Sequence, residues 1–172
     1  MKSLKIALAL IIATVMFSIS ADHVIAQGKS EGKGNSKKEE KKLDKEAKKL
    51  AKAAEKTGKG LGRNAVFCVL AAHTTIDGFE SGQDLKTKFE SLTDVPFGQF
   101  VAAVLLVDRL DEAGFGLNEV LAMLVAGKSI GEITRDAGVN MGEVRKGFGE
   151  FRSELARSMT TPPTKDCFQA AP

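Results

Sequence analysis

The chain has no tryptophan and no tyrosine among its 172 residues, although it has ten phenylalanines. Tryptophan and tyrosine combine an apolar ring with a hydrogen-bonding group, so sugar-binding and interface platforms commonly use them. Their absence argues against a carbohydrate-binding protein. Histidine is almost as scarce, because only His23 and His73 are present. If His23 is removed with an export signal, a metal site built from two histidines cannot be assembled.

The first 26 residues have the three parts of a secretory signal peptide in the right order. Lys2 and Lys5 give a basic start, an apolar run covers Ile6 to Ile19, and small residues end at Ala26. The apolar run of roughly 14 residues is shorter than the ~20 that a membrane-spanning helix needs. The sequence therefore predicts cleavage between Ala26 and Gln27 and a periplasmic or secreted protein. An uncleaved N-terminal anchor is the alternative.

In the chain that follows, a net positive charge is found only in residues 27–62. Twelve lysines and six acidic residues between Lys29 and Gly60 give a net charge of +6, whereas residues 61–172 carry −4. The composition predicts a Gly/Ser/Lys linker up to about Ser36. Strong helix formers then predict a helix over residues 37–56, with a narrow apolar stripe made of Leu43, Ala47, Leu50 and Ala54.

Half of this stripe is alanine, so we expect a separate, largely solvated helix that buries little. Opposite charges four residues apart, such as Asp44 and Lys48, are expected to support it. The preferred role is a charged spacer. The alternative is electrostatic attachment to an anionic membrane or envelope surface, which the interspersed carboxylates Glu39, Glu40, Asp44 and Glu46 would weaken.

Residues 63–159 are expected to form an all-α domain, a compact bundle of five or six helices. Sustained period-2 alternation between hairpin turns, the pattern of strands, is not found. Ser81 and Asp84 resemble a capping box, and Asn118, Ser129 and Asn140 can act as N-caps of three short helices. The longest apolar face, near residues 96–113, predicts the central helix. Residues 160–172 are expected to form an irregular tail, because the Pro162-Pro163 pair within it would end any helix.

Within this domain, residues 116–148 carry a helical pattern with a glycine turn. Its first helix has the apolar residues Val120, Leu121 and Leu124, and its second helix has Ile130 and Ile133. The turn is formed by Ala137-Gly138-Val139, and Val144 is the apolar residue near the start of the third helix. This pattern resembles the tri-helical helix-turn-helix module of LuxR-type regulators and sigma-factor C-terminal domains. The resemblance implies a third helix that reads DNA.

The residues at that third helix argue against nucleic-acid binding. Residues 140–143 read Asn-Met-Gly-Glu, and basic side chains follow only at Arg145 and Lys146. DNA binding draws much of its free energy from neutralised phosphates, whereas this part of the chain is net acidic. We expect the helical crossing to be structural, and a DNA-binding regulator remains the alternative if the N-terminus is not an export signal.

Cys68 and Cys167 are the only cysteines. In an oxidising compartment such a pair predicts a disulfide, which would draw the tail and Phe168 towards Val66 and Phe67. The alternative is two free thiols, with Cys68 a small buried hydrophobe.

A nucleophilic Cys68–His73 pair has little support, because a spacing of five places the side chains on different helix faces and no oxyanion motif accompanies them. His73, near Asp77, is instead expected at a helix end. Asp108, Asp111 and Glu112 read as a solvated face, with a weak cation site as the alternative. No catalytic, metal-binding or cofactor-binding residue is proposed. The sequence thus favours an exported, non-enzymatic helical protein with a structural or interaction role.

Overall fold

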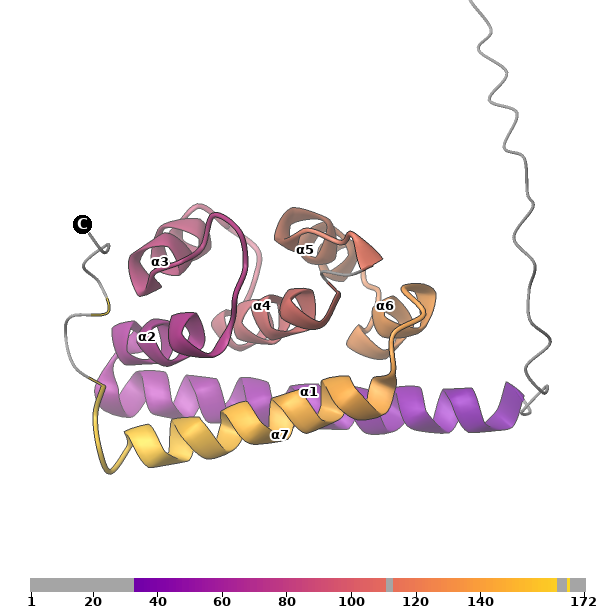
Figure 1. Cartoon of the computed structure of the whole chain (residues 1–172), viewed down its shortest axis with the longest axis horizontal. Helices are drawn as coiled ribbons and strands as arrows, with labels where there is room; N and C mark the ends of the chain where they lie inside the picture. Colours follow the sequence, from indigo (N-terminus) through magenta and orange to yellow (C-terminus); the bar gives the residue numbers. More distant parts are fainter. Residues whose placement is uncertain (1–32, 111–112, 164–166, 168–172) are drawn as a thin grey trace, which may run out of the picture. The chain divides into compact units, whose positions relative to one another are not determined.

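A computed structural model describes residues 33–110, 113–163 and 167 (Figure 1). The predicted signal peptide and its cleavage site between Ala26 and Gln27 lie outside these residues, as does Phe168. In the described part the secondary structure is helical throughout, which confirms the all-α class. It comprises seven helices: α1 (Lys33–Leu61), α2 (Arg63–His73), α3 (Gly82–Glu90), α4 (Phe97–Leu110), α5 (Leu117–Val125), α6 (Ile130–Asp136) and α7 (Met141–Ser158).

Local capping chemistry sets several of the helix starts. The Ser81 hydroxyl accepts from the Asp84 N–H at 3.2 Å, and the Asp84 carboxylate accepts from the Ser81 N–H at 2.9 Å, so the predicted capping box is confirmed. Ser129 and Asn140 also cap helices as predicted. Asn118 does not cap a helix, because α5 already begins at Leu117 and its N-cap residue is Gly116. The Gly116 N–H donates a hydrogen bond to the Glu119 carboxylate at 3.2 Å.

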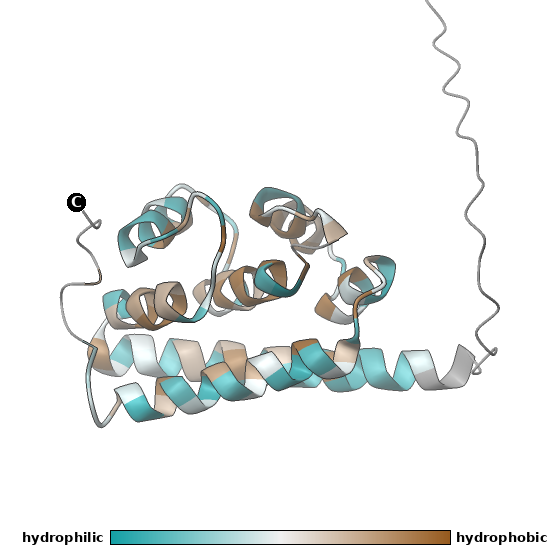
Figure 2. Ribbon diagram, in the orientation of Figure 1, coloured by the Kyte–Doolittle hydropathy of each residue, from teal (hydrophilic) through white to brown (hydrophobic). Residues whose placement is uncertain are grey.

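Helix α4 lies at the centre of the bundle, as its long apolar face predicts. Eleven of its 14 residues are buried. It packs against α1, α2, α5, α6 and α7. Figure 2 shows the resulting contrast, with hydrophobic residues concentrated on α2 and α4 and hydrophilic ones along α1 and α7.

The lysine-rich helix is not the separate helix that the sequence predicts. Leu43, Leu50 and Ala54 are 0% exposed, and Ala47 is 7% exposed. Helix α1 packs against α2, α4, α6 and α7, and it belongs to the same compact unit as they do. The whole stripe, including its alanines, belongs to one hydrophobic core together with buried residues of the neighbouring helices such as Phe100 and Phe151.

Helices α1 and α7 lie side by side and run in the same direction (Figure 1). Apart from Gly147, which has no side chain, their buried residues share one spacing of alternating four and three residues, which is the a/d pattern of a parallel coiled coil. On α1 these residues are Leu43, Ala47, Leu50, Ala54 and Thr57. On α7 they are Val144, Phe148, Phe151, Leu155 and Ser158. The α7 stripe is the bulkier of the two, because it includes Phe148 and Phe151, whereas the α1 stripe includes two alanines.

Two glycines allow neighbouring helices to approach the α1 backbone. A Cβ added at Gly98 of α4 would lie 2.7 Å from the carbonyl oxygen of Ala51. A Cβ added at Gly131 of α6 would lie 2.9 Å from both Cα and the carbonyl oxygen of Glu40. Because both contacts are with backbone, a rotamer change cannot relieve them.

We therefore expect Gly98→Ala and Gly131→Ala each to lower the free energy of unfolding by about 1–3 kcal/mol, the typical cost of overpacking. The matched control is Gly149→Ala in α7, where an added Cβ meets nothing within 4 Å. This substitution should stabilise the protein by up to about 1 kcal/mol, because alanine favours the helix. Urea unfolding followed by circular dichroism measures all three, and stabilisation by all three alanines would contradict the close approach.

Candidate functional site

The outer face of α1 carries many positive charges. Within residues 36–61 of this helix, whose side chains the structure describes, ten residues carry a positive charge, and all ten are exposed lysines: Lys37, Lys38, Lys41, Lys42, Lys45, Lys48, Lys49, Lys52, Lys56 and Lys59. At 100° per residue they fall within an arc of about 140°, centred opposite the buried stripe. We call these ten residues the lysine face. With a rise of 1.5 Å per residue it is about 33 Å long.

The carboxylates of α1 do not lie on this face. All five are partly buried at its borders, where each contacts another helix: Glu39, Glu40, Asp44, Glu46 and Glu55. The expected dilution of the positive charge by interspersed acids is therefore much reduced. The sequence mixes the two signs along the chain, and the helix places most of the lysines away from the carboxylates.

Two of these carboxylates pair with arginines across the α1–α7 seam. Glu39 lies 3.1 Å from Arg145, and Glu46 lies 2.8 Å from Arg152. In the heptad register these are g and e positions, which flank the apolar seam and set partner and orientation in coiled coils. Hydrogen bonds from lysines on α1 and the nearby arginines lower the pKa of both Glu39 and Glu46.

Two other carboxylates cap neighbouring helices. Asp44 accepts a hydrogen bond from the Gly131 N–H at 2.8 Å, and Glu55 accepts one from the Gly98 N–H at 3.2 Å. Both N–H groups belong to first helical turns, which have no partner within their own helix. The two glycines that approach α1 most closely are thus also held by its acids.

This geometry corrects the predicted role of Asp44. It faces the start of α6, and no Asp44–Lys48 ion pair forms. Among the ten lysines, Lys42 and Lys49 pair with Glu39 and Glu46. The other eight have no carboxylate within 4.0 Å in the described part of the chain.

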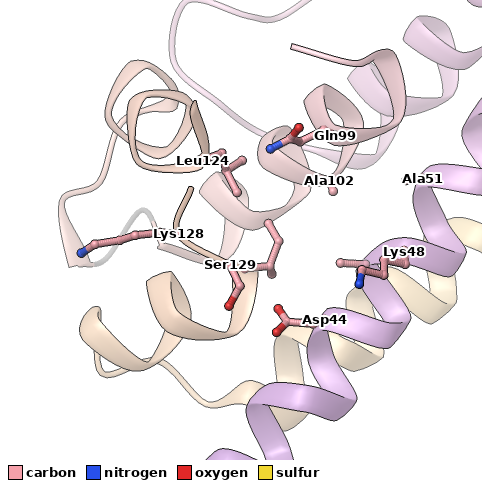
Figure 3. Close-up of a pocket in the computed structure, with 10 residues that line it drawn as sticks. Asp44, Lys48, Ala51, Gln99, Ala102, Leu124, Lys128 and Ser129 are labelled. Carbon is pink, nitrogen blue, oxygen red and sulfur yellow. The ribbon is translucent and has the colours of Figure 1, made fainter. Parts of the chain in front are cut away.

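A pocket of about 330 Å³ opens between α1, α4 and the turn from α5 to α6 (Figure 3). Its wall is mostly apolar and includes the small side chains of Ala51 and Ala102, while Lys48 lies at its α1 side. Asp44 and Ser129 also line it, but both cap α6: the Ser129 hydroxyl accepts from the Glu132 N–H at 3.2 Å. These two groups therefore have structural roles that do not require a bound molecule.

The helix-turn-helix pattern corresponds to α5, α6 and the first half of α7. Val120, Ile133 and Val144 are 0% exposed. The basic residues at the third helix make ion pairs: Arg145 binds Glu39 of α1, and Lys146 lies 3.7 Å from Glu150. Helix α7 therefore packs along α1.

Cys167 is joined by a disulfide to Cys68 of α2, and the Cα atoms of the two residues lie 5.4 Å apart. The predicted pairing is confirmed, and it removes the thiol that a Cys68–His73 nucleophile would need. His73 ends α2 as expected. Its partner is Glu154 of α7, with Nδ1 3.1 Å from the carboxylate, rather than Asp77.

The predicted acidic face is described only in part, because Asp111 and Glu112 lie outside the described residues. Asp108 accepts a hydrogen bond from the Thr75 N–H at 3.0 Å. In the described ranges, no three histidine, cysteine or acidic side chains gather in a way that could hold a metal ion. None of the helices described is long and apolar enough to cross a bilayer.

Comparison of the chain with protein-family models, with curated proteins and with solved structures gave no match. The lysine face is the feature that sequence reasoning undervalued. A helical wheel could have revealed it, because all ten lysines lie opposite the stripe that contains Leu43 and Leu50.

Proposed function

We propose that the protein is exported and acts outside the cytoplasm as a non-enzymatic helical interaction module. The observation that carries the proposal is the disulfide between Cys68 and Cys167. Disulfides persist in oxidising compartments such as the periplasm and the extracellular space, and they are rare in the cytosol. The signal-peptide pattern of residues 1–26 supports the same compartment.

The interaction role rests on how the polar groups are used. Carboxylates of α1 hold other helices, Ser129 caps α6, and Cys68 is oxidised. Lys42 and Lys49 pair with Glu39 and Glu46, and the other eight lysines of the lysine face form a charged surface without an ion-pair partner in the described residues. This distribution favours binding over chemistry at the protein surface.

Cell fractionation with N-terminal sequencing tests export. We expect the mature chain to begin at Gln27 and to be recovered from the periplasm or the medium, with Cys68 and Cys167 resistant to thiol labelling until reductant is added. Ile12→Arg, which interrupts the apolar run, should keep the full-length chain in the cytosol. A wild-type chain with Met1 intact in the cytosol would contradict the proposal and favour the DNA-binding regulator instead.

A further inference from the structure

The lysine face is a surface of one sign on a protein that is otherwise acidic. Residues 61–172 carry a net charge of −4, and the α1 carboxylates are turned to its borders. Helix α1 is consequently basic, whereas the chain that follows it is net acidic. A negatively charged surface attracts α1 and repels much of the remainder, so it orients the protein as well as binding it.

We propose that the lysine face docks the protein flat on an anionic phospholipid surface, with α1 parallel to the membrane plane. This proposal rests on the export proposed above, because an exported protein meets phospholipid headgroups on leaving the cytoplasm. It names the partner class of the interaction module.

The shape of the face fits a planar partner. The lysines follow the side of one helix for about 33 Å, so they can reach headgroup phosphates at the same time. Juxtamembrane lysines contribute binding in proportion to their number near an anionic surface.

The composition of the face predicts adsorption without insertion. The apolar residues of α1, including Leu43 and Leu50, are 0% exposed within the bundle. An amphipathic interfacial helix inserts large apolar side chains into the acyl region of the bilayer. The lysine face has no such side chain between its lysines. Binding should therefore depend strongly on salt, because only charges that solvent ions screen contribute to it.

The same composition argues against a nucleic acid as the partner. Lysine is a hydrated point charge, whereas planar bidentate recognition of phosphate and bases uses arginine. Proteins that hold single strands also stack bases on aromatic rings, and α1 contains none. The ion pairs of Arg145 and Arg152 with Glu39 and Glu46 further reduce the arginines available next to the face.

Vesicle co-sedimentation of the disulfide-bonded mature chain tests the proposal. We expect binding to vesicles of phosphatidylglycerol and phosphatidylcholine, no binding to phosphatidylcholine alone, and release at high salt. The variant Lys41→Gln/Lys45→Gln/Lys52→Gln/Lys56→Gln should lose about two to three orders of magnitude in partition coefficient, since each lysine near the surface contributes about fivefold. These side chains are exposed, so an unchanged melting temperature verifies that the fold is intact.

The matched control removes four positive charges elsewhere: Lys86→Gln/Lys88→Gln/Lys146→Gln/Arg157→Gln. It has the same net charge as the first variant and should retain binding within about tenfold of wild type. Equal losses in the two variants would show that net charge and not the lysine face is responsible. Absence of binding to the anionic vesicles, or tighter binding to duplex DNA or polyphosphate than to them, would also overturn the proposal. The purified chain is used, so a failure of export in the cell leaves this result unaffected and is distinguished from it.

Discussion

Leu50→Ala is expected to lower the free energy of unfolding by about 2–5 kcal/mol, the usual cost of removing a buried leucine side chain. Leu50 is 0% exposed and lies in the seam between α1 and α7. Truncation leaves a cavity that the adjacent Ala47 and Ala54 cannot fill. The loss should appear as a lower urea midpoint for the whole domain, because α1 unfolds together with the helices it contacts.

Lys52→Ala is the control for this substitution. Lys52 belongs to the same helix but is exposed, so its replacement should change the stability by no more than about 0.5 kcal/mol. The comparison decides whether α1 is part of the core. If both variants unfolded at the wild-type urea midpoint, α1 would be an independent, solvated helix, as its charge content alone suggests.

That charge content is the reason why sequence reasoning misplaced α1. The stripe was visible, but its alanines bury little area on their own, and burial depends on what faces them. What identifies the partner of α1 is that residues 144–158 have the same alternation of four and three as residues 43–57. Two stripes with one spacing indicate partners even when they are separated by about a hundred residues, and the larger one supplies Phe148 and Phe151.

Local features were easier to predict because their causes lie within a few residues. The capping box at Ser81 and Asp84 and the central apolar helix follow from adjacent sequence. The hydrogen bond from the Gly131 N–H to Asp44 joins residues 87 positions apart, so no local pattern identifies it. An acid in a lysine-rich run looks solvated until the fold shows which helix start lies beside it.

The disulfide was predictable only in part. The presence of two cysteines predicts the pair, but only the structure shows that the two residues lie close together. Cys167→Ser is expected to destabilise the protein under oxidising conditions by about 4–5 kcal/mol in the chain-entropy model. The large effect comes from the sequence separation of 99 residues between the two cysteines. Cutting the link frees a long loop in the unfolded chain, which gains conformational entropy, while the folded bundle loses only a tether.

The melting temperature should therefore fall by on the order of 10 °C in the absence of reductant. In the presence of reductant the wild type and Cys167→Ser should melt together, because neither then has the cross-link. Cys167 is the better site for the substitution, since Cys68 is 5% exposed and a serine there would add the cost of a buried hydroxyl. A difference that persisted in reductant would mean that the sulfur contributes by packing. Equal melting temperatures without reductant would mean that the disulfide does not form, and the proposed export would then lose the observation that supports it most.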